Sequence, residues 1–135
     1  RHIQLLRRDP SELSCPREKW ILKLSNGNYK DEKFSENIII KKFSKSLNEE
    51  NIHEIYEGLL SELGLGNPKI DKKPKYPYNL IFTNNWMVLI KRKTDNLYGI
   101  SINALGFAGY ILVTEKSDIT YLKKYGPEKL LENFL

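Results

Sequence analysis

Apolar residues recur at helical spacing from about Asn51 to Leu63 and would share one face of a helix: Ile52, Ile55, Tyr56, Leu59, Leu60 and Leu63. Asn48-Glu49-Glu50-Asn51 supplies N-cap candidates and first-turn acids, and Gly64 or Gly66 would end the helix. The pattern predicts one amphipathic helix packed against a core. His53 falls off the apolar stripe and is interpreted as a surface histidine.

Short β-branched and alternating runs predict strands elsewhere. The segment Asn37–Phe43 is rich in isoleucine and favours a strand or a sheet edge. Two further apolar runs, Tyr78–Thr83 and Trp86–Lys91, are separated by Asn84-Asn85 and predict a hairpin. Glu115 to Leu135 is helical in character, with a break at Gly126-Pro127. Together these segments predict an α+β fold, an antiparallel sheet with flanking helices.

The stretch Tyr98–Val113 contains two apolar runs, Gly99–Asn103 and Tyr110–Val113, joined by a hinge with Gly106 and Gly109. Alternation in the first run favours a pair of central strands. Glycines let a backbone turn or approach a ligand closely, so the strand end at Asn103 would present an amide and several backbone N–H groups to a phosphate or ribose. The alternative is a glycine-rich hairpin in which Asn103 only closes its own turn.

Composition narrows the function classes without selecting one. The 135 residues suffice for one domain with a core, and no run reaches the roughly 20 apolar residues of a membrane span. Cys15 is the only cysteine, which excludes an internal disulfide and fits a reducing, cytoplasmic compartment. The net charge of +5 suits polyanions, whether a nucleotide polyphosphate or a nucleic acid.

A family resemblance adds to this interpretation. It rests on the stretch Gly99-Ile-Ser-Ile-Asn-Ala-Leu-Gly-Phe-Ala-Gly109 and on the preceding Tyr78-Asn-Leu-Ile-Phe-Thr83 and Trp86-Met87. These stretches resemble the C-terminal region of diadenosine tetraphosphate phosphorylases, or ATP adenylyltransferases, of the histidine-triad (HIT) superfamily. The match is good from Pro77 to the C-terminus and loose over Ser11–Lys75. It implies a HIT-like antiparallel sheet with flanking helices. Residues 1–8 would end the motif strand, and residues 9–135 would form the C-terminal domain.

The N-terminal residues carry the catalytic part of the resemblance. Arg1-His2-Ile3-Gln4 resembles the family motif His-x-His-x-Gln with its first histidine absent, so the chain would be part of a longer enzyme. The resemblance makes His2 the nucleophile that attacks the α-phosphate and carries AMP, and Gln4 its support on the same strand face. Phosphate would then release the AMP as ADP.

The resemblance also implies the substrate contacts. They carry over to Asn103, Ala104, Leu105 and Gly106, with Gly106 needed for shape rather than for packing, and to Tyr110. Relatives often have a basic residue at the position of Thr114; Lys116 is a candidate replacement. No tightly bound cofactor is implied, only Mg2+ accompanying the nucleotide.

The expected partners follow from the same resemblance. They are an adenine dinucleotide, inorganic phosphate and the N-terminal part of the enzyme; no membrane is expected, nor a nucleic acid. Two other function classes stay open: a non-catalytic nucleotide-binding accessory domain and an RNA-binding module. The RNA-binding module rests on the lysines and tyrosines of Asn67–Tyr78. The alternative for this segment is a solvated loop.

Overall fold

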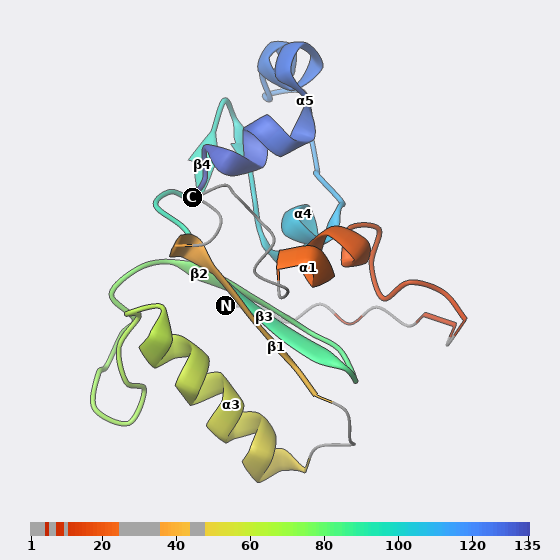
Figure 1. Cartoon of the computed structure of the whole chain (residues 1–135). Helices are drawn as coiled ribbons and strands as arrows, with labels where there is room; N and C mark the ends of the chain where they lie inside the picture. The colour runs from red at the N-terminus through yellow and green to blue at the C-terminus, as the bar shows by residue number, and fades with distance from the viewer. Residues whose placement is uncertain (1–4, 6–7, 10, 25–35, 44–47) are drawn as a thin grey trace.

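Three antiparallel strands form the central sheet of the computed structural model, which describes residues 5, 8–9, 11–24, 36–43 and 48–135 (Figure 1). Strands β1 (Ile38–Lys42) and β2 (Tyr78–Phe82) both pair with β3 (Trp86–Lys91), so the order is β1-β3-β2. The predicted hairpin of β2 and β3 is confirmed. The strand predicted at Asn37–Phe43 is also confirmed, at an edge of the described sheet.

The central strand β3 is buried on both faces because helices cover both sides of the sheet. Its residues Met87 and Leu89 pack toward helix α3 (Glu49–Glu62) in one apolar cluster. Its residues Trp86, Val88 and Ile90 join a second cluster on the opposite face. Figure 1 shows α3 on one side of the sheet, with α1 (Glu18–Leu24), α4 (Ala104–Ala108) and α5 (Thr120–Glu132) on the other. The predicted α+β class is therefore confirmed.

The local signals around α3 and α5 act as predicted. The side chain of Asn48 accepts a hydrogen bond from the backbone N–H of Asn51 at 2.8 Å, which caps the first turn of α3. Helix α5 is kinked at Gly126, whose φ of 81° is non-helical, and Pro127 begins the second segment. None of the described helices is both long and apolar enough to span a bilayer.

The prediction that Gly99–Val113 supplies two central strands is wrong. The described chain has a small separate hairpin of β4 (Asn96–Leu97) and β5 (Ile100–Ser101), followed by α4, and no strand over residues 110–113. The chain coils here because Ile102, Phe107 and Ala108 all enter the cluster that contains Val88. The helical turn lets the adjacent Phe107 and Ala108 both face this cluster, whereas in an extended strand they would point to opposite faces.

Candidate functional site

Asn103 begins α4 as its N-cap residue. Its side-chain oxygen Oδ1 accepts hydrogen bonds from the backbone N–H groups of Leu105 at 2.9 Å and Gly106 at 3.3 Å. Its backbone is extended (φ −120°, ψ −168°), as is typical of an N-cap. Asn103 thus closes its own turn, the alternative that the sequence left open.

This cap changes which atoms are available to a ligand. The N–H groups of Leu105 and Gly106, expected to be free, already donate to Oδ1 of Asn103. The same bonds fix the orientation of the Asn103 amide, so its Nδ2 group faces away from the turn it caps. Among the described residues, no acceptor is bonded to this Nδ2. The donor that this end of α4 offers is therefore a side-chain N–H.

Two arginines from other elements hold α4 at its two ends. Just before its N-cap, the carbonyl of Ile102 accepts from Nη1 of Arg92 at 2.9 Å. At the other end, the carbonyl of Phe107 accepts from Nη1 of Arg17 at 3.3 Å, and that of Ala108 accepts from the Arg17 backbone N–H at 3.1 Å. These donors satisfy carbonyl groups that so short a helix leaves without partners. The position of Asn103 is consequently set by the tertiary structure.

Gly106 is required for packing, not for an unusual backbone shape, so the expectation for this residue is wrong. Gly106 lies inside α4 and is buried. A Cβ atom added there would lie 2.9 Å from Cγ2 and 3.1 Å from Cδ1 of Ile102. The glycine that needs a left-handed conformation is Gly109, with φ of 117°, which ends the helix.

Tyr110 lies at the far end of α4 from Asn103. Its backbone N–H donates to the carbonyl of Leu105 at 2.8 Å, and its side chain is exposed. Five helical residues rise about 7–8 Å. Asn103 and Tyr110 could therefore contact one ligand only if it spans α4, as an extended polyphosphate chain would.

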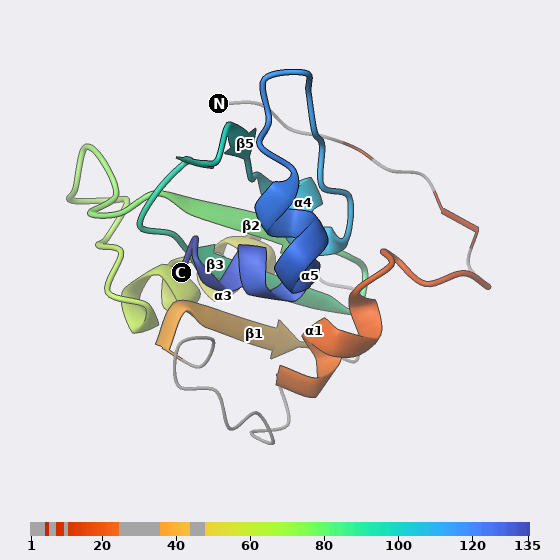
Figure 2. The same cartoon turned by 90° about the horizontal axis from the view of Figure 1, so that it is seen from above.

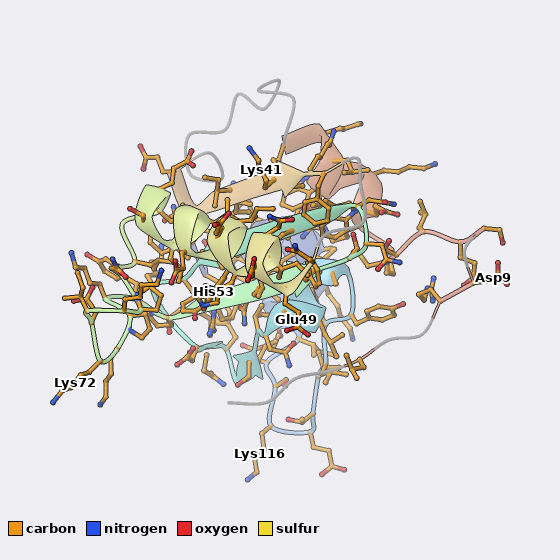
Figure 3. All side chains as sticks on the ribbon, turned by 90° about the horizontal axis from the view of Figure 1, so that it is seen from below. Asp9, Lys41, Glu49, His53, Lys72 and Lys116 are labelled. Carbon is orange, nitrogen blue, oxygen red and sulfur yellow. The ribbon has the colours of Figure 1, made fainter. Side chains whose placement is uncertain are left out.

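Thr114 and Lys116 belong to a turn that packs on the small hairpin. The hydroxyl of Ser117 accepts from the Thr114 backbone N–H at 3.0 Å and donates to the carbonyl of Gly99 at 3.0 Å. The carbonyl of Lys116 lies so close to Gly99 that an added Cβ there would be 2.5 Å away. Figure 3 shows the Lys116 side chain at the tip of this turn, extending away from the domain.

His2 and Gln4, the predicted catalytic pair, lie outside the described residues. Ala104, one of the predicted substrate contacts, is the first residue of α4 and is half-buried. Within the described ranges, no three His, Cys, Asp or Glu side chains gather into a group that could hold a metal ion.

A pocket beside α1, β1 and β3 has no local signal in the sequence. A pocket of about 520 Å³ is lined by Glu18, Leu22, Lys42, Phe43, Asn85 and Trp86. In it, the Glu18 carboxylate accepts from Nε1 of Trp86 at 2.8 Å and from the backbone N–H of Ser14 at 2.9 Å. Burial raises the pKa of Glu18, but these hydrogen bonds outweigh it and the pKa lies below its ordinary value. Glu18 and Trp86 are 68 positions apart in the chain, which explains why no local sequence signal revealed the pair.

Comparison with known proteins assigns the chain to a family. The model of the ATP adenylyltransferase C-terminal domain matches residues 14–134, which include every described element of the fold. Searches of curated proteins and of solved structures returned no match. The chain therefore belongs to the ATP adenylyltransferase family, a family of nucleotidyltransferases, with residues 14–134 as the C-terminal domain.

Proposed function

We propose that this chain belongs to an enzyme that splits diadenosine tetraphosphate with inorganic phosphate, forming ATP and ADP through an adenylyl-histidine intermediate. The observation that carries the proposal is the family match over residues 14–134, together with Arg1-His2-Ile3-Gln4 near the start of the given sequence. That segment resembles the His-x-His-x-Gln motif of the histidine-triad branch. The nucleophile is thus proposed to be His2, with the first motif histidine and the remaining pocket supplied by the N-terminal part of the enzyme.

The proposed reaction has two displacements at one phosphorus atom. A neutral imidazole nitrogen of His2 attacks the α-phosphorus, a P–N bond forms, and the P–O bond to the remaining triphosphate breaks with release of ATP. Inorganic phosphate then attacks the same phosphorus, the P–N bond breaks, and AMP leaves as ADP. Dividing one difficult displacement into two easier ones is the advantage of covalent catalysis.

Fixed hydrogen-bond donors near the phosphates would support both steps. Negative charge on the nonbridging oxygens must be stabilised in the transition state, and donors that are already oriented do this best. We assign one donor to the Gln4 amide and a second to Nδ2 of Asn103. The Asn103 amide is held by its bonds to Leu105 and Gly106, so it would not need to reorganise during the reaction.

The distal phosphates are assigned to the far side of α4. Tyr110 is exposed there and its hydroxyl can donate to a phosphate oxygen. Relatives often carry a basic residue at the position of Thr114, and Lys116 is the nearest basic residue to it in the sequence. The turn that contains Lys116 would have to move for this side chain to contact the distal phosphates. Mg2+ is assigned to the nucleotide, where it would neutralise phosphate charge.

Trapping of the intermediate tests the proposal. Intact protein, with the residues that precede Arg1, is incubated with ATP labelled at the α-phosphate, and label retained on denatured protein is counted. We expect stable labelling of the wild type and none of His2→Ala, with the label released as ADP when phosphate is added. His53→Ala is the matched control, because His53 is an exposed histidine on α3 (Figure 3). Label retained by His2→Ala but lost by His53→Ala would refute the assignment.

A further inference from the structure

The segment Lys69–Tyr76, here called the lysine loop, lies between α3 and β2 and is rich in lysine. Four of its eight residues are lysines, at positions 69, 72, 73 and 75, and one is acidic, Asp71. Figures 1 and 2 both show this light-green loop projecting at the margin of the domain, away from α4. The lysine loop contributes no residue to the site proposed above.

The lysine loop is largely exposed, as expected from its sequence, and its backbone also has a defined hydrogen-bonded structure. Oδ2 of Asp71 accepts from the backbone N–H of Asn67 at 2.7 Å, and the carbonyl of Asn67 accepts from the N–H of Asp71 at 2.7 Å. Farther along, the N–H of Lys75 donates to the carbonyl of Leu65 at 3.0 Å, which ties the loop to the buried end of α3. The lysines consequently extend from a constrained backbone.

Gly66 makes this structure possible. Its φ of 105° is in the left-handed region, and an added Cβ would lie only 2.6 Å from Oδ2 of Asp71. No other amino acid fits this position without displacing the carboxylate. A glycine is thus placed where it lets Asp71 fold back onto Asn67.

This arrangement leaves three cationic side chains without an acidic partner. Asp71 is occupied by the Asn67 backbone, and Lys69 pairs with Glu57 at 2.8 Å. Across the part of the chain that the structure describes, no carboxylate lies within ion-pair distance of Lys72, Lys73 or Lys75. Figure 3 shows Lys72 extending outward from the tip of the loop. Unpaired lysines so close together attract a polyanion.

An exposed aromatic ring adjoins these cations. The side chain of Tyr76 is 52% exposed, and Nζ of Lys91, on β3, lies 5.6 Å from the centre of its ring. Lysines beside an exposed ring are what binding of a single strand requires, since the phosphates contact the cations and an unstacked base stacks on the ring. In a duplex the bases are already stacked, and they are unavailable to Tyr76.

We propose that the lysine loop binds single-stranded nucleic acid, with Lys72, Lys73 and Lys75 at the phosphates and Tyr76 stacked on a base. This revises the expectation from sequence that nucleic acid is not a partner. The reason is the ordered loop backbone, which lowers the entropy lost when the side chains engage a ligand.

Charge substitution tests the phosphate contacts. Binding of a fluorescent 12-nucleotide oligouridylate is followed by anisotropy at several salt concentrations. Replacing Lys72, Lys73 and Lys75 by Ala should reduce the slope of log affinity against log salt by about 2, because each phosphate contact on a single strand contributes about 0.7. The matched control replaces Lys19, Lys23 and Lys123, also exposed, and so changes the net charge equally. An equal loss of slope in this control would overturn the proposal, since net charge alone would then explain binding.

Two aromatic variants test stacking. Tyr76→Leu should weaken binding roughly tenfold, the scale of one base on an aromatic ring, while Tyr76→Phe should bind as the wild type does. Thermal unfolding of each variant checks that the fold is kept. Equal weakening by both variants, or competition by a 12-base-pair duplex as effective as that by the single strand, would overturn the proposal. Neither result would bear on labelling at His2.

Discussion

The guanidinium group of Arg92 donates from Nη1 to the carbonyl oxygen of Ile102, 2.9 Å away and ten residues later in the chain. Arg92 directly follows β3, and Ile102 directly precedes the N-cap of α4. The side chain of Arg92 is 10% exposed, so this bond is shielded from water. It couples the central strand of the sheet to the turn that holds Asn103.

Arg92→Ala should lower the free energy of unfolding by about 2–4 kcal/mol, because the Ile102 carbonyl loses its buried donor and the packing of the guanidinium is lost. Chemical denaturation measures the change. Asp95→Asn is the control: Asp95 also pairs with Arg92, at 2.7 Å, but its side chain is 75% exposed, so the loss should stay below about 1 kcal/mol. Equal losses would show that the exposed ion pair, not the buried bond, is the important contact.

Gly106→Ala should destabilise the domain by about 1–3 kcal/mol, since its Cβ would lie 2.9 Å from the Ile102 side chain in a packed core. Gly58→Ala should have the opposite effect and stabilise by about 0.5–1 kcal/mol. Gly58 is inside α3, and no atom lies within 4 Å of an added Cβ there. Thermal and urea unfolding of both variants measure the difference. If Gly106→Ala were also stabilising, α4 would have room to move away from Ile102.

Substitutions of Asn103 should separate capping from ligand binding. Asn103→Asp keeps an oxygen that caps α4 but loses the Nδ2 donor, so stability should hardly change while nucleotide affinity falls by about 1–3 kcal/mol or more. Asn103→Ala loses both groups and should also lose about 1 kcal/mol of stability. Denaturation and nucleotide titration of the intact protein measure the two effects. Unchanged affinity in both variants would limit Asn103 to its role as a cap.

Glu18 should contribute to loss of stability in acid. Its pKa is lower in the folded protein than its ordinary value of 4.5, because hydrogen bonds from Trp86 and Ser14 outweigh the opposing effect of burial. Its stabilising contribution is therefore present above about pH 4.5 and disappears as the pH falls through the lower folded value. Glu18→Gln, which cannot titrate, should flatten the dependence of unfolding free energy on pH below that value. An identical acid limb in wild type and variant would rule out this contribution.

The sequence by itself determined the elements whose information is local. The apolar stripe of α3 and its Asn48 cap lie within one stretch, as do the runs that form the β2–β3 hairpin. The break at Gly126-Pro127 is also local, because both residues restrict the backbone wherever they occur. These segments needed no partner to be identified, and they were sufficient to predict the α+β class.

Only the tertiary structure decided the form of Gly99–Val113. Five helical residues are too few to show a helical period, and the alternation of Ile100 and Ile102 matches a strand equally well. The choice depends on burial of Phe107 in the cluster beside β3 and on Arg17, which donates to the Phe107 carbonyl from 90 residues earlier in the chain. Contacts between residues so distant in sequence leave no periodic pattern. The position of Asn103 at the start of a helix is therefore determined by the tertiary contacts and could not be predicted from the sequence.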